Sequence, residues 1–194
     1  MLLLIDKFIF EVRHRFLLRW VLANVVGWTI GLYMGVLNPL CFAGTGIITG
    51  LVLGATQWWA LRDTVLATRP DEASTNIQPA QRWIGFTFAG AALGLIPAAI
   101  LGAVVYLFAN GLAALLAGGL LGLAVGIGQW MILKRLSQQV FLWLLINLVG
   151  GAICGLLTVI PIIRGLPLGL LAGSALFGYL TGRVLERIII ETPQ

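Results

Sequence analysis

The 194-residue sequence is poor in charged residues and in the residue types that most often bind metals. Charged residues make up 10% of the chain, against about 25% in a typical soluble domain. It has two cysteines and one histidine, and Cys41 and Cys154 form no CxxC pair. So few charges cannot cover the surface of a soluble domain of this size. The composition therefore excludes a soluble globular enzyme and a disordered chain.

Long apolar stretches take the place of the missing charges. Hydrophobic residues make up 60% of the chain, and each stretch of roughly 20 residues can cross a hydrocarbon core of about 30 Å. The sequence predicts an all-α integral membrane bundle of six transmembrane helices. We expect the spans over residues 16–37, 43–62, 82–108, 111–133, 140–160 and 166–184.

The basic residues predict how the chain is oriented. They lie before the first span, after the last one, and in the second and fourth connections, with Arg164 the single exception. All acidic residues lie on the same side as this majority. By the positive-inside rule both termini are cytoplasmic, in a bacterial inner membrane or an equivalent internal membrane. The net charge of +5 is therefore an orientation signal, and we expect no nucleic-acid partner.

Little of the chain lies outside the expected spans. Residues 1–15 place apolar and charged side chains on opposite helical faces, which predicts an amphipathic helix lying in the membrane interface. Residues 63–81 form a cytoplasmic loop and residues 185–194 a cytoplasmic tail. Three tryptophans stand at the cytoplasmic starts of the first, third and fifth spans, where we expect their rings at the headgroup boundary. They are Trp20, Trp83 and Trp143.

An internal repeat is the most informative pattern. The motif G-x-x-x-G-x-x-Q-W-x-x-L-[RK] occurs at 50–62 and again at 122–134. The helices that precede these motifs share W-x3-[NT]-x2-G, which occurs a third time from Trp143. We therefore expect three αα-hairpin repeats, at 16–62, 82–133 and 134–184. The last helix keeps Gly169 and Gly173 at the glycine spacing but has Leu176-Phe177 where Gln-Trp would fall.

The repeated motif also carries a resemblance. The chain resembles bacterial multi-pass membrane proteins of unassigned role that contain tandem G-x-x-x-G-x-x-Q-W-x-x-L-R hairpins. The resemblance covers the first five spans better than the sixth. It implies a membrane protein and supplies no active site to transfer.

Glycines recur at four-residue spacing along several spans. Such spacing leaves a smooth helix face on which a neighbouring backbone can approach closely. The neighbour is either another helix of this chain or a second membrane subunit, so these are candidate helix-docking faces. They comprise Gly27, Gly31, Gly35, Gly46, Gly50, Gly54, Gly118, Gly122, Gly126, Gly165, Gly169 and Gly173.

Away from their ends, the expected spans contain amides and hydroxyls as polar residues and no Asp, Glu, Lys, Arg or His. This argues against proton relays, ion relays and voltage sensors, which place ionisable groups there. Asn24 and Gln57 lie at equal depth on two antiparallel helices, so we predict a hydrogen bond between them. These residues form either a structural clamp in each hairpin, a binding ring for a ligand or partner, or amide ligands to a pigment or metal. The candidate ring comprises Asn24, Gln57, Thr87, Gln129 and Asn147.

The sequence favours a non-catalytic accessory or scaffold subunit. Ser174 has no histidine to activate it, so we expect no catalytic residue, and no metal site is indicated. The expected partners are membrane lipids and other integral membrane subunits, met through the glycine faces. One alternative is a small-molecule-binding transporter component, similar in size and topology to the S-components of energy-coupling-factor transporters. Another is a pigment-, quinone- or lipid-binding membrane protein. No particular cofactor is indicated.

Overall fold

The chain is helical wherever its structure is described. The computed structural model describes residues 2–37, 42–63, 79–107, 109–134, 140–159 and 168–190, and these ranges contain no strand. The all-α prediction is therefore confirmed for this part of the chain. The helices are α1 (Leu2–Leu37), α2 (Phe42–Leu61), α4 (Pro79–Tyr106), α5 (Asn110–Leu133), α6 (Val140–Val159) and α7 (Leu168–Ile190).

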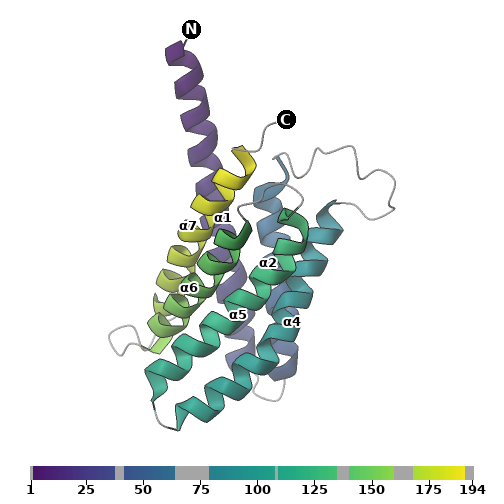
Figure 1. Cartoon of the computed structure of the whole chain (residues 1–194), viewed down its shortest axis with the longest axis vertical. Coiled ribbons are helices and arrows are strands. Elements are labelled where there is room, and N and C mark those ends of the chain that lie inside the picture. Colours follow the sequence, from purple (N-terminus) through teal and green to yellow (C-terminus); the bar gives the residue numbers. More distant parts are fainter. Residues whose placement is uncertain are drawn as a thin grey trace.

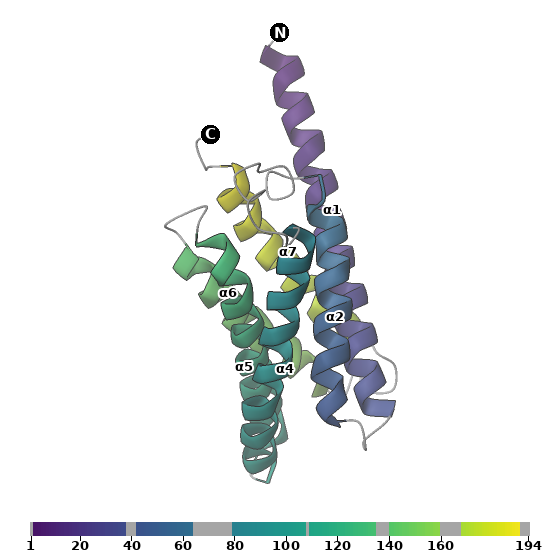
Figure 2. The ribbon, with the colours of Figure 1, turned by 90° about the vertical axis from the view of Figure 1, so that its right-hand side faces the viewer.

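The helices form a closed ring in chain order. Each helix packs against the next one along the chain, and α7 packs against α1 to complete the ring. Consecutive helices run in opposite directions, so the described part of the chain returns to the end at which it started. Figures 1 and 2 show the resulting bundle, in which α1 begins and α7 ends at the same end.

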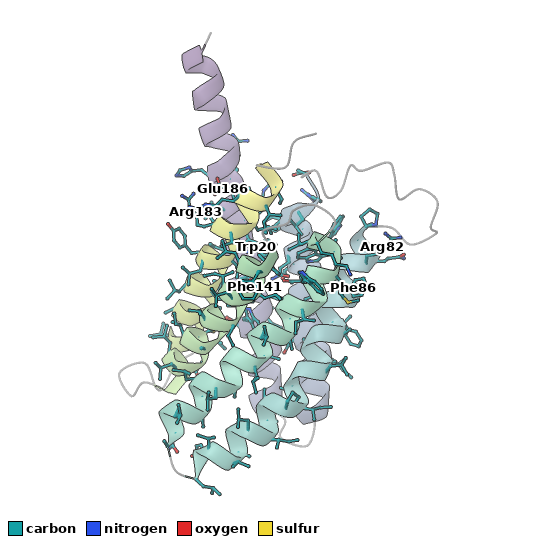
Figure 3. The ribbon with its side chains drawn as sticks, viewed as in Figure 1. Trp20, Arg82, Phe86, Phe141, Arg183 and Glu186 are labelled. Carbon is teal, nitrogen blue, oxygen red and sulfur yellow. The ribbon has the colours of Figure 1, made fainter. Side chains whose placement is uncertain are left out.

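Charge is concentrated at one end of this bundle. We call it the charged end and define it by Arg19, Arg62, Arg82, Lys134 and Arg183; the other is the uncharged end. In Figure 3 the labelled residues Arg82, Arg183 and Glu186 lie toward the charged end. Every charged side chain that the structure describes lies at this end, which leaves the rest of the described bundle apolar.

The helices have the length and surface of membrane spans. Four are long and apolar enough to cross a membrane: Pro79–Tyr106, Asn110–Leu133, Phe141–Thr158 and Leu168–Ile189. A shorter apolar stretch runs over Gly46–Leu61 in α2. Large apolar side chains also point outward, with Leu93 of α4 exposed by 70% and Phe141 of α6 by 76%. Such a surface suits a hydrocarbon environment, as expected of a multi-pass membrane protein.

The first helix begins before the expected span. Residues 2–15 are continuous with the expected span and form a single helix of 36 residues, about 54 Å long at 1.5 Å per residue. No glycine or proline stands before Gly27 to interrupt the helix. Figures 1 and 2 show the first turns of α1 extending beyond the rest of the bundle along the same axis. The expected interfacial helix is therefore continuous with the first span, and its position relative to a membrane stays a prediction.

The last helix continues beyond the expected span. The sequence predicts the span over 166–184, and α7 runs on to Ile190. The additional turns contain Glu186, which the sequence placed in the tail. They also contain Leu185 and Ile188, both buried in the core.

One hairpin is longer than its neighbours at the uncharged end. From Trp83 to the end of α4 at Tyr106 the helix rises about 35 Å, whereas α6 rises about 24 Å from Trp143 to Val159. Figure 2 shows the α4–α5 hairpin extending past the ends of α1 and α2. Asn110 is exposed at its tip, and the large exposed side chains beside it are apolar and include Val104, Leu107 and Leu112.

Candidate functional site

Three tryptophans meet inside the bundle near the charged end. Trp20, Trp83 and Trp143 are 0%, 1% and 0% exposed. The ring centroid of Trp20 lies 6.1 Å from that of Trp83 and 6.3 Å from that of Trp143, both in edge-to-face arrangement. The predicted headgroup position is therefore wrong for all three. Their helices turn these rings toward the bundle interior, where they pack with Leu61, Leu133 and Leu185.

The predicted polar residues lie next to these rings, on the side of the uncharged end. Asn24, Gln57, Thr87, Gln129 and Asn147 are all at most 1% exposed. Gln57 Nε2 donates to Asn24 Oδ1 over 3.0 Å, which confirms the predicted hydrogen bond between α1 and α2. Gln129 Nε2 donates to Thr87 Oγ1 over 3.1 Å, and this bond joins α5 to α4 in the same way.

A further bond, which the sequence did not predict, links these two pairs. Gln129 Nε2 also donates to Gln57 Oε1 over 2.6 Å. We call Asn24, Gln57, Gln129 and Thr87 the polar network. It ties together four helices, because its members come from α1, α2, α5 and α4.

Asn147 forms no hydrogen bond to this network. Its Nδ2 donates to the carbonyl oxygen of Trp143 over 2.8 Å. Asn24 makes the same local bond, from Nδ2 to the carbonyl oxygen of Trp20, also over 2.8 Å. The local bond orients both amides, but only Asn24 also accepts a hydrogen bond from a glutamine of the neighbouring helix.

Thr181 is a polar member of the site that the sequence reasoning missed. Its Oγ1 accepts a hydrogen bond from Trp20 Nε1 over 3.0 Å, which joins α7 to α1. Thr181 is 1% exposed. The signal was present in the spacing, since Gly178-x2-Thr181-x3-Leu185 matches Gly54-x2-Gln57-x3-Leu61.

Contacts between helices show that Gly178 is the counterpart of Gly54 and Gly126. A Cβ at Gly54 would lie 3.3 Å from the Cβ of Thr87, and a Cβ at Gly126 would lie 2.8 Å from that of Asn147. An equivalent contact joins α7 to α1, where a Cβ at Gly178 would lie 3.0 Å from the Cβ of Asn24.

The expected alignment of the last helix with the repeat is therefore wrong. It makes Leu176 equivalent to Gln57 and Gln129, whereas the contacts make Thr181 equivalent to them. Burial agrees with the contacts, because Leu176 is 38% exposed and points away from the core.

The predicted glycine faces are largely occupied within the chain. For example, a Cβ at Gly50 would lie 2.6 Å from the Cα of Phe88, and Gly118 faces the carbonyl oxygen of Gly151. Gly169 is buried as well, while Gly165 and the surroundings of Gly35 lie outside the described residues. The faces with close neighbours in this chain are those of Gly27, Gly31, Gly46, Gly50, Gly54, Gly118, Gly122, Gly126 and Gly173.

Ion pairs stand at the charged end, and they involve Glu186 and Asp63. Glu186 is only 4% exposed and accepts a hydrogen bond from Arg183 Nη1 over 2.9 Å, one turn away on α7. Asp63 pairs with Arg19 over 2.6 Å and so connects the end of α2 to α1. The Asp63 pair is solvent-exposed and adds little stability, whereas burial makes Glu186 depend on its partners.

Toward the uncharged end, the bundle contains an apolar pocket of about 250 Å³. Five helices line it: α1, α4, α5, α6 and α7. The polar atoms of its side chains belong to Trp28, Cys154 and Thr158. The pocket is lined by Trp28, Leu95, Ala98, Ala99, Ala114, Ala117, Gly118, Leu121, Gly151, Cys154, Gly155, Thr158 and Phe177.

Known proteins give no further guide to the site. No family model, curated protein or solved structure matches the chain. Across the described ranges, no group of three or more histidine, cysteine, aspartate or glutamate side chains could hold a metal ion. The polar network and the apolar pocket are therefore the two features of the described bundle that bear on its function.

Proposed function

We propose that this chain is a six-span membrane protein that acts as a non-catalytic accessory or scaffold subunit for other integral membrane proteins. The observation that carries the proposal is the polar network. Its members are at most 1% exposed and bond to one another over 2.6 to 3.1 Å. Their hydrogen-bonding capacity is used largely between helices, as in a structural clamp.

A clamp of this kind suits a membrane interior. An unpaired amide in hydrocarbon is costly, whereas an interhelical hydrogen bond contributes about 0.6–2 kcal/mol. The three tryptophan rings cover the polar network on the side of the charged end. We infer that the network holds α1, α2, α4 and α5 in place.

The proposed topology has three hairpins with cytoplasmic termini. The contact that recurs at Gly54, Gly126 and Gly178 supports the hairpin repeat, because each of these glycines meets the next hairpin in the same way. The collection of described charges at one end supports the orientation. We further propose that the projecting start of α1 lies among the headgroups. The resemblance to bacterial multi-pass proteins rests on the repeated motif alone.

Partners in this proposal meet the outward side chains of the bundle. The glycine faces with close neighbours are used for internal packing, so they cannot also dock a second subunit. The outer face of α4 presents Leu93, Ile96 and Ile100, each more than 60% exposed. This face is long and uncharged, as required for contact with another membrane-spanning helix.

The test is cross-linking in the native membrane. A photoreactive amino acid at Ile96 should form specific cross-links to another integral membrane protein, which mass spectrometry would identify. The matched control places the same amino acid at Leu145, which is exposed on α6. Cross-links to lipid alone at both positions would contradict the scaffold proposal.

The pocket favours one alternative over the other. A transporter component for a polar solute needs convergent polar groups in its cavity. The lining of the described pocket offers little beyond one hydroxyl, one thiol and one indole N–H. A lipid-binding role is therefore the second candidate function.

A further inference from the structure

The pocket lies in the half of the bundle that is farther from the charges. Along α4, Ala99 is about 24 Å from Trp83, and along α6, Thr158 is about 22 Å from Trp143. Trp28 lies only about 12 Å from Trp20 along α1. The lining therefore extends over roughly 10 Å along the helices, beside the base of the protruding α4–α5 hairpin.

Small residues create this space. Ala98 and Ala117 stand where larger side chains would fill the bundle axis, and Gly151 and Gly155 bring the backbone of α6 to the wall. One side is rigid, because Trp28 packs edge-to-face on Phe177 with ring centroids 5.5 Å apart. The pocket therefore has a firm apolar wall rather than loosely packed side chains.

The lining selects an apolar occupant. It contains no charged residue, and the Thr158 hydroxyl is already bonded to the carbonyl oxygen of Gly155 over 2.6 Å. A charged guest would lose its hydration without gaining a counter-charge. The buried Trp28 Nε1 is a donor without a hydrogen-bond partner, and the rest of the lining is mainly apolar. Cavities lined in this way exclude water and accept apolar guests.

The position of the pocket favours an acyl chain. Its volume of about 250 Å³ extends over roughly 10 Å along the helices, within the proposed hydrocarbon region of the bundle. A membrane supplies acyl chains that lie along the helices in this region.

We propose that the pocket binds one acyl chain of a membrane phospholipid, inserted parallel to the helices from the uncharged end. This inference rests on the proposed membrane location but not on the scaffold role. The chain fills the gap that small side chains leave between α4, α5, α6 and the Trp28–Phe177 pair. The bound lipid would then be a structural component of the bundle.

The test uses the full chain in phosphatidylcholine vesicles that contain a phosphatidylcholine with a diazirine at the end of one acyl chain. After irradiation, mass spectrometry locates the labelled residues. We expect labels on the pocket residues Ala117 and Cys154 in addition to outward residues such as Leu93 and Phe141. Ala99→Phe, which fills the pocket, should reduce the pocket labels several-fold and leave the outward labels unchanged.

The matched control is Ala103→Phe, one turn farther along α4 at an exposed position. It should leave all labels unchanged. Persistence of the pocket labels in a folded Ala99→Phe variant would overturn the proposal. Outward labels without pocket labels in the wild type would overturn it even if that variant does not fold. A wild-type chain without any label would instead contradict the membrane location.

Discussion

Gln57 is the residue on which the polar network depends most. Its Nε2 donates to Asn24 and its Oε1 accepts from Gln129, so one side chain links three helices. Asn24, by contrast, keeps its bond to the carbonyl oxygen of Trp20 when the glutamine is removed. The two residues of the predicted pair are therefore not equivalent.

We expect Gln57→Leu to destabilise the bundle by about 1–3 kcal/mol and Asn24→Leu by about 0.5–2 kcal/mol. The double variant should recover part of the summed loss, because it removes both unmet hydrogen-bonding demands together. Unfolding in mixed micelles with increasing denaturing detergent measures each free energy. Strictly additive losses would show that the bond contributes nothing.

The bond between Trp20 and Thr181 closes the ring at the residue scale. Thr181→Val keeps the shape and removes the acceptor, so we expect a loss of about 0.5–1.5 kcal/mol. Trp20→Phe should cost more, because it also leaves a cavity. The double variant should lose less than the sum, as tested by a double-mutant cycle on the unfolding free energies. Trp59→Phe, at a position 42% exposed, is the control and should have little effect.

At the scale of helices, packing is decided by which glycines face a neighbour. Gly50 of α2 meets the backbone of α4, while a Cβ at Gly85 of α4 has no neighbour within 4 Å. The two residues therefore form a matched pair. They share the residue type and the helical setting and differ only in what lies opposite.

Gly50→Leu should separate α2 from α4 and prevent folding or cost several kcal/mol, because the facing backbone cannot move aside. Gly122→Leu should act alike, since Gly122 faces the backbone of Asn147. Gly85→Leu should fold normally and gain up to about 1 kcal/mol from its higher helix propensity. Expression and thermal unfolding in detergent report the difference. Equal behaviour of Gly50→Leu and Gly85→Leu would contradict the packing argument.

At the scale of the whole molecule, the ring joins the first helix to the last. The described part of the chain contains six helices, and α1 begins and α7 ends toward the charged end. In the proposed orientation the charged end faces the cytoplasm.

Single cysteines in a background with Cys41→Ser and Cys154→Ser test this orientation. Gln78→Cys, in the 63–81 loop, should react with a membrane-impermeant maleimide only after the membranes are permeabilised. Asn110→Cys, at the start of α5 near the uncharged end, should react in intact spheroplasts. The reverse pattern would invert the topology.

The sequence by itself determined the class of protein and the depth of the polar residues. Apolar length and turn positions gave helices whose boundaries mostly agree with the structure. Equal depth on antiparallel neighbours was enough to predict the bond between Asn24 and Gln57. The link from Gln57 to Gln129 was not predictable, because it depends on which hairpins stand side by side.

Only the tertiary structure decided which face of each helix points inward. In a soluble protein an apolar face marks the core, but in a membrane the lipid is as apolar as the core, so hydrophobicity does not separate the two. Trp20 and Trp83 could therefore be placed at the surface when they are buried, and Thr181 could be overlooked. The contact between Gly178 and Asn24 sets the register of α7 against α1, and this register brings Thr181 to the indole N–H of Trp20.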